Sequence, residues 1–206
     1  MYVSICSIFS AIILAAAIFL LGIQHAHAQA ACTQYAAPTG SGNGSSSSQP
    51  FKVVNFWPVA KPGHTLCLLD GEYRGSASMI MPPRNLSGTA SARITVRALN
   101  DGKVRLNGQG STYPVQLSHN HYFTIEGINA SNSAGSVVSI TYSNNNIVRR
   151  VAAWDAADGN HSIFGIHDAN HNLLEDVAGW GIARFRERFG FDRLDDVASL
   201  PLLLLV

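Results

Sequence analysis

The sequence has 206 residues, of which 47% are hydrophobic and 13% are charged, and this length suits one domain with a hydrophobic core. Its 14 Lys and Arg balance 13 Asp and Glu, so the formal net charge is +1. Because this balance leaves no basic field to hold phosphates, we expect no nucleic-acid partner.

A nearly uninterrupted apolar run, IFSAIILAAAIFLLGI, occupies residues 8–23. It is shorter than the roughly 20 apolar residues that a membrane span needs, and Ala26 and Ala28 form an A-x-A cleavage site after it. We therefore predict a signal peptide over residues 1–28, a secreted or periplasmic location, and no stable membrane span after cleavage. Because no Lys or Arg precedes Lys52, an amino-terminal membrane anchor is the alternative.

Two cysteines, Cys32 and Cys67, follow the predicted signal peptide, which would carry Cys6 away. An even number of cysteines in an exported chain indicates a disulfide, because oxidising compartments preserve such bonds. We predict a Cys32–Cys67 disulfide that fastens the amino-terminal arm to the first coil of the fold. Two unpaired buried thiols are the alternative.

Small polar residues without an apolar period fill residues 36–50, AAPTGSGNGSSSSQP, and predict a flexible arm over residues 29–50. Phe51, Val54, Phe56 and Trp57 then stand at near-helical spacing, ahead of a strand-like segment at 64–75. A short amphipathic element at this point would cover the open end of the first coil, whose core and edge amides would otherwise be exposed.

One pattern is written three times, as HYFTIEGINA (121–130), NNNIVRRVAAW (144–154) and HNLLEDVAGW (171–180). The offsets are 151 − 128 = 23 and 177 − 151 = 26 residues, a period typical of a solenoid. Short strand-like runs separated by Asn, Gly, Ser and Asp favour a parallel β-helix, which we predict over residues 51–183. Equivalent inward residues should stack in two columns, Ile125–Val148–Leu174 and Ile128–Val151–Val177.

Asparagine-rich triplets recur near the same point of each repeat, as HNH (119–121), NNN (144–146) and NHN (170–172). Asn tolerates left-handed backbone conformations and bonds to its own backbone, so we interpret these triplets as a corner lined with stacked Asn side chains. A catalytic role for them is the alternative. Arg97, Lys103 and Arg105 alternate with apolar residues, which indicates an outward solvated face or, alternatively, a row that binds sugar acids.

The segments Y-x-x-P-T-G-S-G-N-G from Tyr35, QPFK at 49–52, AKPGHTLCLLDGEYRG at 60–75 and SARITVRALNDGKVRLNGQG at 91–110 resemble one family. They are similar to the amino-terminal signature of secreted right-handed parallel β-helix proteins of the pectate-lyase-like group, and the resemblance covers residues 35–183. It implies an all-β, right-handed parallel β-helix with a short amino-terminal capping helix. It also implies a monomer acting on an acidic polysaccharide as a polysaccharide lyase. A non-catalytic carbohydrate-binding β-helix or an inactive truncated fragment is the alternative.

Lyases of this kind remove the proton α to a uronate carboxyl and expel the 4-linked sugar. This chemistry needs a base, an acid and a cation, which can be Ca²⁺ held by carboxylate oxygens. The densest cluster of such groups lies at 149–176. From it we assign Arg149, Arg150, His161 and His167 to catalysis, Asp155, Asp158 and His171 to substrate binding, and Asp168, Glu175 and Asp176 to Ca²⁺. A surface ladder of Arg150–Asp176 and Arg149–Glu175 ion pairs is the alternative.

No N-T-D, D-D and G-H-G series, D-P-H-E motif or W-I-D-H motif occurs, so these residues do not choose between lyase, hydrolase and binding protein. The repeat stops after Ala183, and residues 184–206 form an atypical, charged tail that finishes in PLLLLV. We interpret this tail as the product of a truncation. The alternative is a capping helix with Phe185, Phe189, Leu194 and Val197 on its inner side.

Overall fold

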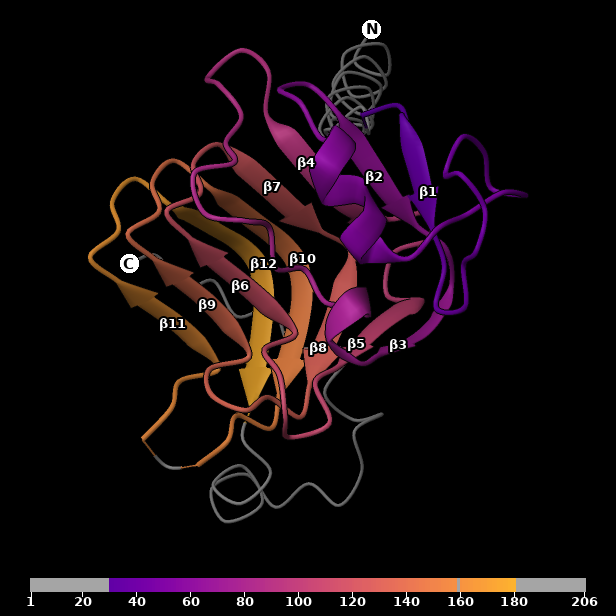
Figure 1. Ribbon diagram of the computed structural model, residues 1–206. Helices are drawn as coiled ribbons and strands as arrows, with labels where there is room; N and C mark the ends of the chain where they lie inside the picture. The colour runs from indigo at the N-terminus through magenta and orange to yellow at the C-terminus, as the bar shows by residue number, and fades with distance from the viewer. Residues whose placement is uncertain (1–29, 159, 181–206) are drawn as a thin grey trace, which may run out of the picture. The chain divides into compact units, whose positions relative to one another are not determined.

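The computed structural model describes residues 30–158 and 160–180, which form a coiled stack of short parallel strands with very little helix (Figure 1). Each coil crosses three faces in turn. Face 1 contains β1 (Gln34–Ala36), β2 (Thr65–Leu68), β4 (Ile94–Ala98), β7 (Phe123–Glu126) and the first halves of β10 (Ile147–Trp154) and β12 (Leu173–Trp180). Face 2 contains β3 (Gly71–Arg74), β5 (Val104–Asn107), β8 (Ile128–Ser131) and the second halves of β10 and β12. Face 3 contains β6 (Val115–Ser118), β9 (Val138–Thr141) and β11 (Phe164–His167).

Every strand pairing in the described part of the chain is parallel, and each strand pairs with the equivalent strand of the next coil. On face 1, Ile125 is level with Val148, and Val148 is level with Leu174. On face 2, Val151 is level with Val177, and Ile128 and Val151 are both essentially inaccessible to solvent. The predicted all-β parallel β-helix and both of its inward columns are therefore confirmed.

Corner 1, between faces 1 and 2, is a single residue in the later coils. Gly127, Arg150 and Asp176 occupy it with φ angles of 73°, 50° and 51°. One left-handed residue turns the chain while leaving strand pairing intact on both sides, so β10 and β12 each extend over two faces. Glycine at 127 also has a local cause, because a Cβ there would collide with the carboxylate of Asp101.

Corner 3, from face 3 back to face 1, has four residues between β6 and β7 and five in each of the next two coils, and in every case the first and fourth are left-handed. Asn146 donates a hydrogen bond to Asn172 Oδ1 (3.1 Å), and Asn170 N donates one to Asn144 Oδ1 (2.7 Å). The predicted corner of stacked Asn side chains is thus confirmed for the two coils that contain residues 144–146 and 170–172. Asn120 differs, because it is level with Ser143 and donates to backbone carbonyl oxygens of a neighbouring loop instead.

The segment expected to be a flexible arm is built into the fold. Its residues 34–36 form β1, which pairs with β2, so the solenoid begins before residue 51. The loop that follows closes through backbone hydrogen bonds such as Tyr35 N to Gly44 O (2.9 Å) and Gly42 N to Pro50 O (2.7 Å). The small residues that suggested flexibility are required by this closure, because a Cβ at Gly44 would enter the ring of Phe51.

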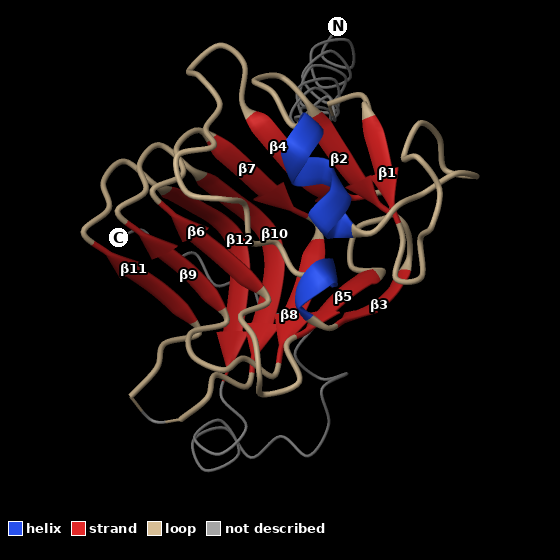
Figure 2. Cartoon of the chain, viewed as in Figure 1, coloured by secondary structure: helices blue, strands red, loops and turns tan. Residues whose placement is uncertain are grey.

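A short 3₁₀ helix, η1 (Val53–Val59), supplies the predicted cap at the amino-terminal end of the solenoid. It buries Val53, Phe56 and Trp57 in the core and leaves Val54 exposed. It lies beside a second short helix, η2 (Ser76–Ser78), as Figure 2 shows. The helix is 3₁₀ and short because Pro58 lacks the amide hydrogen that a longer α-helix would use.

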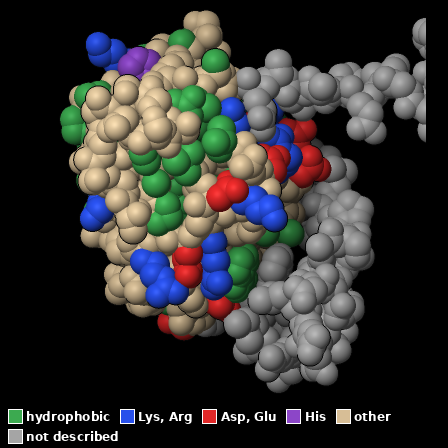
Figure 3. All heavy atoms as spheres, turned by 90° about the vertical axis from the view of Figure 1, so that its right-hand side faces the viewer, with side chains coloured by type: hydrophobic (Ala, Val, Ile, Leu, Met, Phe, Trp, Pro, Cys, Tyr) green, Lys and Arg blue, Asp and Glu red, His purple; other side chains and the backbone are tan. Residues whose placement is uncertain are grey.

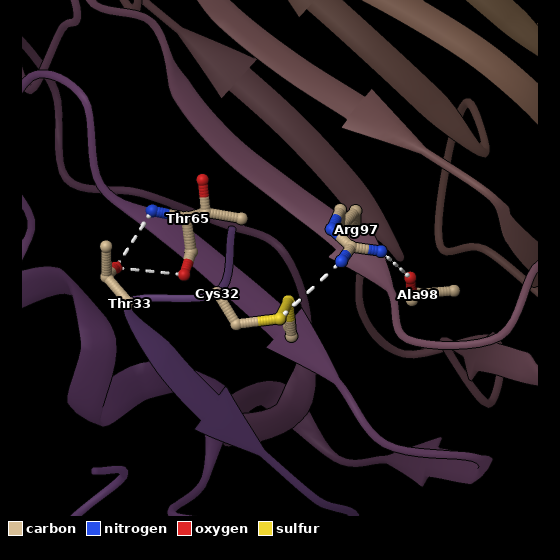
Figure 4. The surroundings of a disulfide bond; sticks show 6 residues. Cys32, Thr33, Thr65, Arg97 and Ala98 are labelled. Carbon is tan, nitrogen blue, oxygen red and sulfur yellow. Dashed lines mark hydrogen bonds between the residues drawn. A yellow bond between two sulfur atoms is a disulfide. The ribbon is translucent and has the colours of Figure 1, made fainter. Parts of the chain in front are cut away.

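The predicted disulfide between Cys32 and Cys67 is present, with the two Cα atoms 5.6 Å apart (Figure 4). Beside it, the Thr33 hydroxyl donates to Thr65 O and accepts from Thr65 N, both at 2.9 Å. Arg97 lies on the other side, 3.6 Å from Cys32 Sγ. The disulfide therefore fastens the chain before β1 to β2 of the first coil, as expected.

The predicted signal peptide at 1–28 and the tail at 184–206 lie outside the described residues. Within 30–158 and 160–180, no helix is long and apolar enough to cross a membrane.

Candidate active site

The residues assigned to the site from sequence do not gather in one place. Arg149 and Arg150 lie at the end of face 1 and at corner 1, whereas Asp155, Asp158 and His161 lie at corner 2, between faces 2 and 3. His167, Asp168 and His171 lie at or beside corner 3, and Glu175 and Asp176 lie on the last described coil. Only Arg149 with Glu175 and Arg150 with Asp176 occupy equivalent positions of successive coils, and the other assigned residues lie at other corners.

Arg149 and Arg150 are engaged by carboxylates of the protein itself. Arg149 Nη2 lies 2.6 Å from Glu126 Oε2, and Arg150 Nε donates to Asp101 Oδ2 at 2.6 Å. Arg150 Nη2 also lies 3.1 Å from Glu126 Oε1, without hydrogen-bond geometry. The Glu126 side chain is only 1% exposed, so its charge needs both neighbouring cations.

Arg149 and Arg150 form their ion pairs with earlier coils, and not with the next coil as the ladder considered from sequence required. Arg149 is level with Glu175 in the next coil, as the repeat predicted. In the described residues, however, no ion pair joins Arg149 to Glu175 or Arg150 to Asp176. Both arginines pair with carboxylates of earlier coils, Glu126 and Asp101. The reason is burial, since the inaccessible Glu126 attracts the cations more strongly than the half-buried Glu175 and the exposed Asp176, which water already solvates.

The carboxylates assigned to Ca²⁺ are also apart. Asp168 lies in corner 3 before face 1, Glu175 lies on the outside of face 1, and Asp176 forms corner 1 after it. Within the described part of the chain, no group of three or more His, Cys, Asp or Glu side chains is placed to hold a metal ion. The assigned residues do not fit a shared calcium site in this arrangement, and we assign no step to the metal.

Asp158 and His161 do meet, on the exposed loop between β10 and β11. His161 Nδ1 lies 2.8 Å from Asp158 Oδ1, and this hydrogen bond lowers the pKa of Asp158. His167, Asp168 and His171 are all exposed. His171 and Asp168 occupy the two left-handed positions of corner 3, with φ angles of 56° and 50°.

The outside of face 2 carries the best-connected group of polar side chains, which we call the Arg105 cluster. Its members come from successive coils and from the start of corner 2: Glu72, Arg74, Arg105, Asn107, Trp154 and Asp155. Glu72 is at its centre on the first coil. Its carboxylate bonds Arg74 Nη2 at 2.7 Å and Asn107 Nδ2 at 2.7 Å, and lies 3.9 Å from Arg105 Nε. The Asn107 hydrogen bond and the Arg74 hydrogen bond lower the pKa of Glu72.

Arg105 is a half-exposed cation of this cluster, with 43% of its side chain accessible, whereas the more exposed Arg74 is paired directly with Glu72. Its guanidinium carbon lies 5.3 Å from the centre of the Trp154 ring, and its Nε lies 3.4 Å from Ser131 Oγ. Trp154 itself is only 9% exposed. The indole ring therefore contacts one side of the guanidinium through a cation–π interaction and leaves the other side of Arg105 open to solvent.

Asp155 follows Trp154 at corner 2, where it takes the left-handed conformation with φ of 58°. Partial burial raises the pKa of Asp155, and the Arg105 guanidinium opposes part of that increase. A carboxylate that is partly withdrawn from water is a stronger proton acceptor than an exposed one. The Arg105 cluster thus combines an exposed cation with a carboxylate tuned to accept a proton.

The sequence predicted Asp155 as a substrate-binding residue and indicated Arg105 only as one of three basic residues that alternate with apolar ones. It missed Glu72, Arg74 and Trp154. Glu72 is level with Arg105, an offset of 105 − 72 = 33 residues, whereas Arg105 is level with Asn129 at 129 − 105 = 24. The long first coil hides the alignment, although the similar segments GEYRG and KVRLNG provide a weak signal for it.

Comparison with solved structures finds the same fold in the crystal structure of pectate lyase Pel9A. The match has a TM-score of 0.50 and 21% sequence identity, and covers 59% of this chain and 33% of the Pel9A chain. The chain therefore spans about a third of the length of that protein. No protein-family model and no curated protein sequence matches the chain. The likeness supports a pectate-lyase-like parallel β-helix.

Proposed function

We propose that this protein is an exported, carbohydrate-active β-helix of the polysaccharide-lyase type, which cleaves an acidic polysaccharide by β-elimination at the Arg105 cluster. The observation that carries the proposal is the solvent-accessible Arg105 guanidinium, which lies over Trp154 and whose charge acts on the partly buried carboxyl of the next residue, Asp155. The likeness to a protein described as a pectate lyase supports the choice of reaction and of an acidic glycan as substrate.

In the proposed reaction, Arg105 pairs with the carboxylate of a uronate residue and stabilises the negative charge that develops on it. Asp155 accepts the proton from the carbon α to that carboxylate. The electron pair of the broken C–H bond forms a carbon–carbon double bond as the bond to the 4-linked oxygen breaks. Water then protonates the departing sugar oxygen. Trp154 and Glu72 act as positioning residues, because they contact Arg105 rather than the substrate.

The test is an assay for the unsaturated, ultraviolet-absorbing product with pectate, alginate and a glycosaminoglycan as substrates. We expect R105A and D155N to lower kcat/KM by at least about 100-fold, the usual contribution of a general base or a charge-stabilising group. Lys61→Ala, which removes an exposed cation elsewhere, should change nothing. Absence of an unsaturated product from all three substrates would contradict the proposal. Addition of a chelator in the same assay tests the calcium requirement predicted from the resemblance.

A second candidate function is glycan binding without cleavage, as a binding module or as an inactive fragment. Its support is the length of the match, since the chain corresponds to only 33% of the pectate lyase chain. Retention on an immobilised acidic glycan without product formation would favour this alternative. Export and a monomeric state are part of both proposals. The disulfide supports export, because such bonds persist in oxidising compartments.

A further inference from the structure

Corner 3 exposes an aromatic ring together with a cation, on a different corner from the Arg105 cluster. Three side chains form what we call the corner-3 row, namely Arg84, His119 and Tyr142. His119 and Tyr142 occupy the same position in successive coils, because Ser118 is level with Thr141 immediately before them. The corner-3 loops that carry them are stacked between the ends of β6, β9 and β11 and the starts of β7, β10 and β12 (Figure 1).

Tyr142 is 51% exposed, and few large hydrophobic side chains in the described residues are as accessible. Its backbone is left-handed, with φ of 52°, as at the first position of the other corner-3 loops. The centre of its ring lies 5.0 Å from that of His119, at an interplanar angle of 44°. The contact fixes the phenol ring in place while half of its surface faces water.

Arg84 completes the row from the loop before β4. Its Nη2 lies 3.0 Å and 2.9 Å from the two ring nitrogens of His119. The loop is held in place by hydrogen bonds from Asn85 N to His119 O (3.1 Å) and from Gly88 N to His121 O (3.0 Å). The guanidinium is therefore fixed beside the aromatic pair.

No carboxylate of the described residues neutralises the charge of Arg84. Arg74, Arg149 and Arg150 each lie within 4.0 Å of a carboxylate, but Arg84 has no such partner among residues 30–158 and 160–180. An exposed, oriented guanidinium without a carboxylate is suited to bidentate binding of an external carboxylate. An exposed aromatic ring beside it is suited to packing against the apolar face of a sugar ring.

We propose that the corner-3 row is a second glycan-binding site, separate from the Arg105 cluster, which takes one uronate-containing segment of an acidic polysaccharide. A pyranose ring packs on Tyr142, and a carboxylate on the same or the adjacent sugar pairs with Arg84. The proposal rests on the proposed function for the class of ligand, but not for the place where it binds.

In the proposed complex, Asp168 of the next coil determines which way the sugar carboxylate points. Asp168 occupies the position of His119 and Tyr142 in that coil, since His167 is level with Thr141, and it is exposed. Its carboxylate repels an acidic sugar, so the sugar carboxylate points toward Arg84 and away from Asp168. Removal of this charge should strengthen binding, whereas removal of the Arg84 charge should weaken it.

The experiment is a titration of the ¹⁵N-labelled protein with a hexasaccharide of polygalacturonate, followed by amide chemical shifts. We expect shifts at Tyr142 and its neighbours Ser143 and Asn144, with about tenfold weaker binding there for Y142A and for R84A. D168N should bind about threefold more tightly. The control is Val54→Ala, which trims an apolar side chain that is 43% exposed on η1 and should have no effect.

Separate readouts distinguish this inference from the proposed function. Shifts at Arg105 and Ser131 without any at corner 3 would overturn the second site and leave the proposed function intact. Shifts at corner 3 that Y142A abolishes, together with no product and no shifts on face 2, would support the second site and contradict cleavage at the Arg105 cluster. An equal response to the neutral hexasaccharide of glucose would overturn the role given to Arg84.

Discussion

Asp155 and Glu126 are both carboxylates near arginine, yet their surroundings give them opposite tasks. Glu126 is inaccessible and is enclosed by Arg149 and Arg150, so its charge stabilises the junction of face 1 and corner 1. Asp155 is only partly buried, and its pKa is raised because burial outweighs the attraction of Arg105. A group that is costly to ionise in the folded state is a poor stabiliser and a good proton acceptor.

The substitution D155N should therefore stabilise the fold while it removes turnover. A folded-state pKa above the ordinary value of 3.8 means that wild-type stability falls as the pH rises from 3.8 through the folded-state pKa. We expect D155N to be more stable than the wild type at pH 7 and equally stable at pH 3, with a small difference at pH 7 because water screens a carboxyl that is only partly buried. Urea unfolding at the two pH values measures this difference. A variant less stable than the wild type at pH 7 would show that Asp155 is a structural carboxylate.

The substitution E126Q should cost about 3 kcal/mol in the free energy of unfolding, because it leaves two cations beside an uncharged, buried group. Glu72→Gln is the matched control, since Glu72 also contacts two arginines but is 31% exposed. Its cost should stay below about 1 kcal/mol because water screens the pairs. Equal losses for the two variants would contradict the burial argument.

Among the elements, the Gly-rich loop between β1 and η1 shows how small residues can order a segment. Gly40 and Gly42 approach the backbone of Phe51 and Gln49, and Gly44 meets the ring of Phe51 in a left-handed conformation with φ of 78°. Phe51 is in turn part of the hydrophobic core. The loop therefore seals the amino-terminal end of the solenoid in cooperation with η1.

Alanine at Gly44 should destabilise the protein more than alanine at Gly102. Both residues have a positive φ, 78° and 72°, so both substitutions carry the left-handed cost of about 1 to 2 kcal/mol. A Cβ at Gly102 meets nothing within 4 Å, whereas one at Gly44 collides with Phe51. We expect a further loss of about 2 kcal/mol for Gly44→Ala from the displaced core ring, measured by chemical unfolding. Similar losses at both sites would mean that the loop moves away without cost.

The whole molecule is stabilised mainly by stacking, since each coil pairs only with its neighbours through parallel strands. Such a structure is weakest at its ends, where a coil has one neighbour. At the amino-terminal end, β1, η1 and the Cys32–Cys67 disulfide together reinforce the first coil. The disulfide closes a long segment, with a sequence separation of 35 residues.

Loss of the disulfide in C32S should lower the free energy of unfolding by about 4 kcal/mol, the value that the chain-entropy relation gives for a loop of this length. Thermal unfolding with and without a reductant measures the effect. The reductant should lower the melting temperature of the wild type and leave that of C32S unchanged. A reductant-insensitive wild type would contradict a stabilising disulfide.

The sequence by itself determined the solenoid, its columns and its Asn-lined corner. These follow from local rules, because stacked coils place equivalent residues together whenever the coil length is constant. The columns Ile125–Val148–Leu174 and Ile128–Val151–Val177 were readable for this reason. The disulfide followed from counting the cysteines that remain after the predicted signal peptide.

Only the tertiary structure decided which polar side chains meet. Coil lengths differ, from 33 residues between Glu72 and Arg105 to 24 between Arg105 and Asn129, so spacing alone does not align the Arg105 cluster. Burial also chose between partners at equivalent positions of the neighbouring coils, since Arg149 pairs with the inaccessible Glu126 and not with Glu175. The solvent accessibility of a side chain is a property of the folded surface and cannot be read from the linear sequence.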